Sequence, residues 1–173
     1  MSTFGDTTLG TADDSFGANE VQARKFASFP GGDVSSLTLC CKYKAAANFK
    51  GAVYAADGAG GIPGTLLFAS AEFTMTSGMT SHEFRTVNKA GGGSTTISAQ
   101  DIWIAWAFSG GIYISDGSTG GTGIYAGAAY SGQFPAEWDG GSYAFNRLTR
   151  CYLTYTTASG LSIPLLNHLL LGD

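Results

Sequence analysis

Residues 102–109 read IWIAWAFS, and this stretch decides the fold class. Ile102, Ile104 and Ala105 flank Trp103 and Trp106, so apolar side chains occupy consecutive positions instead of alternating with polar ones. A strand formed here would be buried on both faces, as strands in the middle of a covered sheet are. The sequence therefore predicts a central β-strand in a layered, β-rich domain.

Outward from this strand, the chain repeats short strand-like segments separated by residues that favour turns. In segment 34–43, Leu37, Leu39 and Cys41 fall on one side and Thr38 on the other, the two-residue period of a strand with one buried face. We expect about nine or ten strands, spaced as in a sandwich or barrel. They are predicted at 21–29, 34–43, 49–56, 66–75, 82–87, 94–98, 102–109, 111–115, 122–130 and 149–157.

Composition supports an all-β class. Charged residues make up 13% of the 173-residue chain, aromatic residues another 13%, and there are 26 glycines. Low charge with many glycines and aromatic rings is poor material for a helix bundle and suits short strands joined by tight turns. We predict one β-sandwich domain over residues 1–157. Residues 1–20, polar and rich in Gly, Thr and Asp, form either an edge strand or a loose N-terminal arm.

Charge and hydropathy bear on the partners. The net charge is −4 and the nine basic residues are scattered, so we expect neither nucleic acid nor an acidic membrane surface as a partner. The first residues lack a secretory signal pattern, and no stretch approaches the roughly 18 apolar residues of a membrane span. These features predict neither export by a signal peptide nor membrane insertion.

The three cysteines are expected to be buried free thiols, in a protein made in a reducing compartment. Cys40 and Cys41 are adjacent, so on a strand they point to opposite faces and do not bridge each other. A pairing of one of them with Cys151 stays open. No metal site is predicted at these residues.

A resemblance lies in segment 52–70, AVYAADGAGGIPGTLLFAS. A strand ending in a tyrosine, an Asp-Gly turn and a Pro-Gly-x-Leu step resemble Gly-rich jelly-roll or carbohydrate-binding-like β-sandwich modules of bacterial surface proteins and bacteriophage structural proteins. The resemblance covers about residues 20–157. It implies a jelly-roll-like antiparallel sandwich with an adhesive or architectural role and no catalytic centre. The matching residues are Tyr54, Asp57, Gly58, Pro63, Gly64, Leu66 and Leu67.

Catalytic and metal motifs are not recognisable in the sequence. The two histidines, His82 and His168, lie in no ligand or nucleophile pattern, so we predict that the chain is not an enzyme and needs no cofactor. Calcium could use loop acids at 13–14, 57–58, 116–117 and 139–140. Asp-Gly is first of all a turn dipeptide, however, and the dense acidic spacing of a calcium loop is missing.

Exposed aromatic rings would be needed for glycan contact, and segment 124–145 offers several. Trp138 lies between Glu137 and Asp139, and Tyr125 and Tyr130 precede it. These five residues are the candidate glycan contacts, because an apolar plate beside hydrogen-bonding acids suits a sugar. The competing interpretation, which we favour, is that the rings cover an open end of the sandwich core.

The C-terminal segment 158–173 differs from the rest of the chain, because it holds the densest apolar cluster. Ser162, Pro164 and Gly172 punctuate it as a short helix, although an extended conformation is the alternative. The segment is too short to be stable alone, so we predict a docking tail that packs on a partner chain or folds back on its own sandwich. Its assembly residues are Ile163, Leu165, Leu166, Leu169, Leu170 and Leu171.

These features together predict a non-enzymatic bacteriophage virion protein, either a head decoration protein or a tail or fibre component. It would assemble in the host cytoplasm through the C-terminal tail, with copies of itself, most plausibly as a trimer, or with a capsid or tail protein. The alternative is a carbohydrate-binding or adhesive module at the cell surface or outside the cell.

Overall fold

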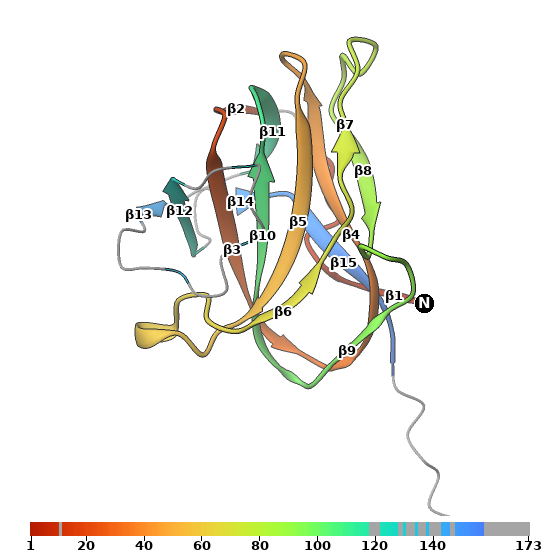
Figure 1. The fold of residues 1–173 in the computed structure, drawn as a ribbon, viewed down its shortest axis with the longest axis vertical. Coiled ribbons are helices and arrows are strands. Elements are labelled where there is room, and N and C mark those ends of the chain that lie inside the picture. The colour runs from red at the N-terminus through yellow and green to blue at the C-terminus, as the bar shows by residue number, and fades with distance from the viewer. Residues whose placement is uncertain are drawn as a thin grey trace, which may run out of the picture.

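The computed structural model describes residues 1–10, 12–117, 122–127, 130, 134, 138, 143–145 and 148–157. Within these residues the chain forms two antiparallel sheets and, apart from a single 3-10 turn, η1 (Ala59–Gly61), no helix. The two sheets face each other as a sandwich (Figure 1). The all-β sandwich predicted from the strand periods is confirmed.

Sheet A has eight strands, and its long central strand is β4, flanked by β15 and β8. The N-terminal residues add β1 beside β15 and β2 beside β11, so two N-terminal strands line edges of this sheet. The edge-strand alternative for residues 1–20 therefore holds. Sheet A comprises β1 (Ser2–Gly5), β2 (Ala12–Phe16), β4 (Gly32–Tyr43), β8 (Glu83–Asn88), β9 (Thr95–Ile97), β11 (Ile112–Gly117), β14 (Leu148–Thr149) and β15 (Cys151–Thr156).

Sheet B has seven strands, with β10 in the middle between β3 and β5, as the IWIAWAFS stretch predicts. Figure 1 shows these three strands side by side in one layer. Sheet B comprises β3 (Glu20–Phe29), β5 (Asn48–Ala55), β6 (Leu66–Ala69), β7 (Phe73–Thr74), β10 (Gln100–Phe108), β12 (Gly123–Gly127) and β13 (Tyr143–Phe145).

The main core lies between the two sheets. From β10, Ile102, Ile104 and Trp106 enter it, and Leu37 and Leu39 of β4 face them from sheet A. Each such side chain contributes on the order of 1.5–3 kcal/mol when it leaves water. This core fixes which face of every strand points inward.

A second apolar cluster lies on the outer face of sheet B. Trp103, on the alternate side of β10 from Trp106, packs there with Tyr54 and Trp138 over a floor of alanines. Sheet B is therefore covered on both faces, which explains the continuous apolar run at 102–109.

The structure has fifteen strands in its described part, more than the nine or ten expected. The additional strands are short, and β2, whose sequence is ADDSF, has no apolar period. The predicted strand 66–75 is two strands, β6 and β7, because both pair with β5 but around an interruption at Ser70. These strands form because they pair with a neighbouring strand. The alternation of apolar and polar residues in their own sequences does not predict them.

Strand β4 departs from the expected single buried face. Leu37, Leu39 and Cys41 point into the main core as predicted, yet Thr38 is 1% exposed and Cys40 is fully buried on the other side. The Cys40 thiol lies against Ser115 and the backbone of Gly10, so the N-terminal segment covers this part of sheet A.

Candidate functional site

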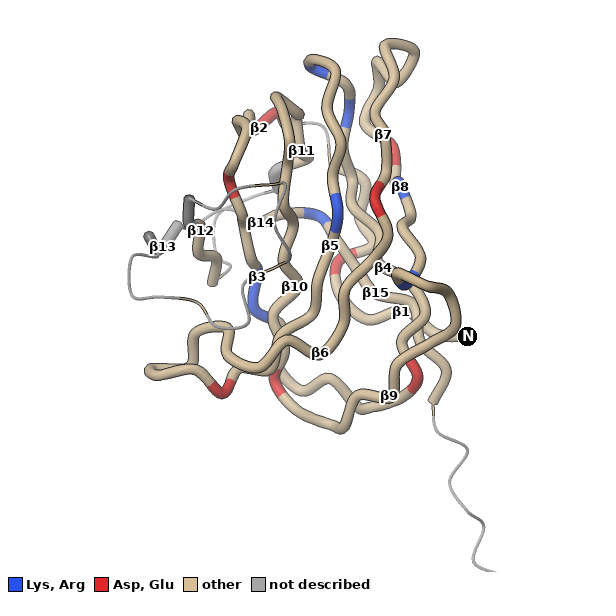
Figure 2. Tube along the Cα trace, viewed as in Figure 1, with Lys and Arg blue, Asp and Glu red and all other residues tan. Residues whose placement is uncertain are grey.

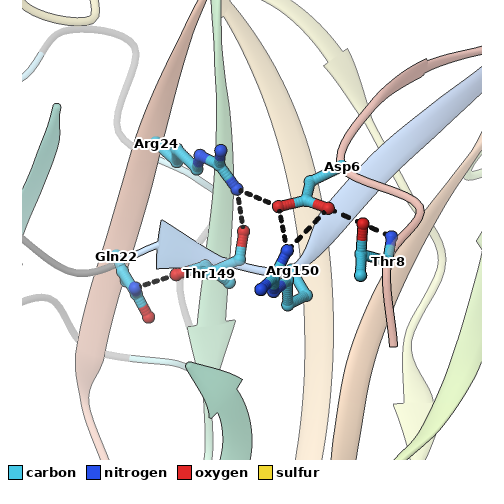
Figure 3. Close-up of polar contacts among 6 residues, drawn as sticks. All are labelled: Asp6, Thr8, Gln22, Arg24, Thr149 and Arg150. Atoms are coloured by element: carbon cyan, nitrogen blue, oxygen red, sulfur yellow. Dashed lines mark hydrogen bonds and ion pairs between the residues drawn. The ribbon is translucent and has the colours of Figure 1, made fainter. Parts of the chain in front are cut away.

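The most connected polar site of the described residues is a carboxylate held between two arginines, drawn in Figure 3. Asp6 follows β1, and its oxygens lie 2.8 and 3.1 Å from Nη1 of Arg150 and 3.2 Å from Nη1 of Arg24. The backbone N–H of Thr8 donates a further hydrogen bond of 3.0 Å to the same carboxylate. All three charged side chains are largely buried, with exposed fractions between 13% and 17%.

The cluster extends to Thr149 and Gln22. Arg24 Nη1 donates a 2.7 Å hydrogen bond to the carbonyl of Thr149, and the Gln22 amide donates to the Thr149 hydroxyl. Gln22 and Arg24 belong to β3 of sheet B, whereas Thr149 and Arg150 lie at the β14–β15 junction of sheet A. The site therefore joins both sheets and the N-terminal segment, and we call these five residues, Asp6, Gln22, Arg24, Thr149 and Arg150, the polar latch.

The electrostatics of the latch suit a structural tie. Burial alone would raise the pKa of Asp6, but the hydrogen bonds from Thr8, Arg150 and Arg24 outweigh it and leave the pKa lowered. A carboxylate kept ionised between two guanidinium groups is a poor proton donor or acceptor near neutral pH. The arrangement fixes geometry and offers no general acid or base.

All three cysteines are free, buried thiols, and Cys151 directly follows Arg150 of the latch. Burial raises the pKa of Cys151 to about 12 and raises those of Cys40 and Cys41 as well. Because the thiolate is the reactive form, none of the three has the character of a nucleophile. The pairing of Cys151 with Cys40 or Cys41, left open by the sequence, is not made.

Of the candidate glycan residues, Trp138 and Tyr130 belong to the cluster on the outer face of sheet B, whereas on β12 it is Ile124, next to Tyr125, that packs there. Trp138 is 7% exposed, and its ring packs edge-on against Tyr54 with centroids 5.9 Å apart. Tyr125 on β12 is 37% exposed. Glu137 and Asp139 lie outside the described residues. The burial of Trp138 agrees with a ring that covers the sheet. Little of the ring is exposed for a sugar to stack on.

Tyr130 is held at the margin of this face. Its hydroxyl donates a 2.6 Å hydrogen bond to Oε2 of Glu72, and Asn48 donates to Oε1 of the same carboxylate at 2.7 Å. The Lys50 ammonium lies 5.0 Å from the Tyr130 ring centroid and 5.4 Å from that of Phe134. Burial is the largest cause that raises the pKa of Tyr130, and the hydrogen bond to Glu72 and the charge of Glu72 raise it further. These contacts fasten the ring to β5 and the turn before β7.

His82 lies close to Asp13, with Nε2 3.3 Å from Oδ1, although the pair lacks hydrogen-bond geometry. Asp13 also forms an ion pair of 2.7 Å with Lys42. Burial lowers the pKa of His82, and Lys42 adds to this against the effect of Asp13. His82 is therefore neutral near pH 7 and supports packing between β2, β4 and the loop before β8.

The described part of the chain offers neither a cluster of metal ligands nor a membrane-spanning helix. It contains no group of three or more His, Cys, Asp or Glu side chains placed to hold a metal ion. No helix there is both long and apolar enough to span a bilayer. His168 and the assembly residues Ile163, Leu165, Leu166, Leu169, Leu170 and Leu171 lie outside the described residues.

Sequence reasoning missed the polar latch. Asp6 and Arg150 are separated by 144 positions, and Asp6 belongs to a polar segment that carries no strand period. The one available signal is that Arg24, one of only nine basic residues, lies inside a predicted strand. Nothing in that pattern identifies its partner.

Comparisons of the chain with protein families, with curated proteins and with solved structures gave no match. We therefore infer the function from the residues and contacts of this chain alone.

Proposed function

We propose that the chain is a non-enzymatic structural protein of a bacteriophage virion, a head decoration protein or a tail or fibre component, which assembles through its apolar C-terminal segment. In this proposal the sandwich is of the jelly-roll-like type, and the leucines of segment 158–173 bind the partner chain. Assembly takes place in the host cytoplasm.

The observation that carries the proposal is a mismatch between the sandwich surface and the C-terminal segment. Among the described residues, only three large hydrophobic side chains are exposed: Met1, Leu9 and Tyr125. They come from the N-terminus, the loop after β1 and strand β12, which are separate parts of the fold. The described surface therefore offers no apolar area matched to Leu165, Leu166, Leu169 and Leu170, whose burial would be worth on the order of 1.5–3 kcal/mol each.

A partner chain resolves the mismatch. The C-terminal segments of neighbouring copies can cover one another, or each can lie in a groove of a capsid or tail protein. Closed cyclic symmetry hides such segments without leaving an open apolar end, and a trimer is the arrangement we favour. Because the segment follows β15 directly, a copy anchored by it presents the sandwich outward.

Further support comes from the interior. The described residues that carry reactive chemistry are engaged in packing: Asp6 is held between arginines, and the pKa values of the thiols are raised. Three buried free thiols suit folding in a reducing compartment. These features favour an architectural role over a catalytic one.

Particle purification tests the virion assignment. Phage induced from the strain that encodes the chain would be banded in a density gradient and analysed by mass spectrometry. We expect peptides of this chain in the particle band at a fixed ratio to the major capsid or tail protein. Their presence only in the unassembled or secreted protein fraction would contradict the assignment.

A further inference from the structure

The outer face of sheet A, opposite the main core, has a chemistry that the proposed function does not use. Its composition follows from the strand register. One row across the sheet is Thr3, Thr154, Ser36 and Asn88, on β1, β15, β4 and β8 in turn. The next row is Gly5, Tyr152, Thr38 and Thr86 on the same four strands. Their neighbours along the strands, among them Leu37, Leu153 and Val87, point into the main core.

Hydrogen-bonding groups dominate these two rows. Thr38 bonds to Thr86 through their hydroxyls, 2.9 Å apart, which accounts for one buried member of the rows. Thr3 and Asn88 are exposed and Thr154 is partly exposed. No side-chain hydrogen bond ties any of these three to another residue of the described part of the chain. Hydroxyl and amide groups that both donate and accept are thus left for an outside partner.

Two aromatic rings accompany these groups. Phe84 of β8 and Tyr152 of β15 meet edge to face across β4, with centroids 5.3 Å apart, and both remain partly exposed. Gly5 allows the approach of β1, because a Cβ at this position would lie 2.8 Å from the Tyr152 Cα and 2.6 Å from the Cys151 carbonyl oxygen. The face therefore has a partly exposed aromatic pair beside its hydroxyl rows.

Charge is missing from both rows. Figure 2 shows β1 and β15 without a charged residue, in agreement with their sequences. Charged side chains close to the rows in sequence are engaged. Arg150 pairs with Asp6 at 2.8 Å, Arg85 pairs with Glu83 at 2.8 Å, and Lys89 donates to the Gly92 carbonyl at 3.4 Å. A polyanion or an anionic membrane would need free basic residues here.

We propose that this face, the rows around Tyr152, binds a neutral polysaccharide. The C–H side of a sugar ring is apolar and stacks on an aromatic ring, while its hydroxyls match threonine and asparagine side chains. A stable protein interface would call for a larger apolar centre than the Phe84–Tyr152 pair supplies. The leucines of segment 158–173 are also chemically unlike this face. The inference does not depend on the virion assignment.

Binding is tested with the full chain on an array of neutral and acidic bacterial polysaccharides, followed by affinity electrophoresis in gels that contain the best neutral ligand. Tyr152→Ala removes the ring, and Thr86→Lys places a charge on the face at an exposed position. Thr76→Lys introduces the same charge in the loop after β7, and Tyr125→Ala removes an exposed ring from sheet B. Near-UV circular dichroism and thermal unfolding confirm that each variant is folded.

We expect binding to at least one neutral polysaccharide, weakened at least about tenfold by Tyr152→Ala and by Thr86→Lys and unchanged in the two controls. Absence of binding to every neutral polysaccharide would overturn the proposal. Binding lost in Tyr125→Ala but kept in Tyr152→Ala would overturn it too, by placing the site on sheet B. A solution mass that falls to that of a monomer in Thr86→Lys would also overturn the proposal, by making the face an interface between copies.

Discussion

The carboxylate of Asp6 lies 2.8 Å from Nη1 of Arg150, although 144 positions separate the two residues. Strand β1, just before Asp6, pairs with β15, just after Arg150, so the two ends of the described chain are tied by backbone and by charge (Figure 3). Arg24 brings sheet B into the same contact. A small, largely buried charged cluster therefore joins the two sheets and the N-terminal segment.

Neutralising Asp6 should destabilise the protein and reduce the loss of its free energy of unfolding at acid pH. Asp6→Asn leaves Arg24 and Arg150 largely buried without an anion, and we expect a loss of about 1–3 kcal/mol in the free energy of unfolding at pH 7. The pKa of Asp6 is lowered in the folded state from 3.8, so its stabilising effect is present above pH 3.8 and is lost as pH falls through the folded pKa.

Urea unfolding at several pH values measures this difference. The gap between wild type and Asp6→Asn should be constant near neutrality and shrink below pH 3.8. Glu83→Gln is the control, because Glu83 is 54% exposed and its ion pair with Arg85 should contribute little. Equal stability of Asp6→Asn and wild type at pH 7 would show that the latch does not support the fold.

Gly51 lies where the main core leaves no room for a Cβ. It faces Trp106 across the β5–β10 pair, and a Cβ would lie 2.7 Å from Leu37 Cδ1 and 2.8 Å from Trp106 Cζ3. Gly51→Ala should therefore overpack the core and cost about 1–3 kcal/mol by chemical denaturation. Gly78→Ala, with no atom within 4 Å of the added Cβ, should be nearly neutral. A neutral Gly51→Ala would mean that the two sheets pack more loosely there.

Prediction from sequence succeeded where a strand's own pattern determines its surroundings. The run at 102–109 indicates a strand buried on both faces, and β10 lies between β3 and β5 with clusters on each side. Prediction failed where neighbouring strands determine the conformation of a segment. Strand β2 is polar and becomes a strand only by pairing with β11. Cys40 is buried on the face expected to be polar because the distant N-terminal segment covers it.

The candidate site was less predictable than the fold. Trp138, flanked by two acids, resembles a sugar platform in sequence, but contact with Tyr54 is a tertiary property that the sequence does not reveal. The sequence alone could not predict the rows around Tyr152, for a related reason. Single threonines on four strands form one face only when the register is known.

Trp138→Ala should destabilise the fold, since the ring is buried against Tyr54. We expect a loss of about 3–5 kcal/mol in the free energy of unfolding, as for other large buried aromatic rings. Tyr125→Ala serves as the comparison, because Tyr125 is 37% exposed and should cost far less. An unchanged stability in Trp138→Ala, with loss of a glycan signal, would instead support a contact role for this residue.

The thiols should be unreactive in the folded protein. Cys40, Cys41 and Cys151 are fully buried, and burial raises the pKa of each. With an aromatic disulfide reagent at pH 8, we expect negligible labelling of native protein and three thiols per chain after unfolding in guanidinium chloride. Rapid labelling of a native thiol would place that residue at the surface.

Assembly through the C-terminal segment is tested most directly by the solution mass of the full chain, from light scattering after size exclusion. The Leu166→Asp/Leu169→Asp double variant is compared with Leu9→Asp, which changes an exposed leucine of the sandwich. We predict a defined oligomer, favoured as a trimer, for wild type and Leu9→Asp, and a folded monomer for the double variant. An oligomer unchanged by the double substitution, or a monomer in all three proteins, would contradict self-assembly through these leucines.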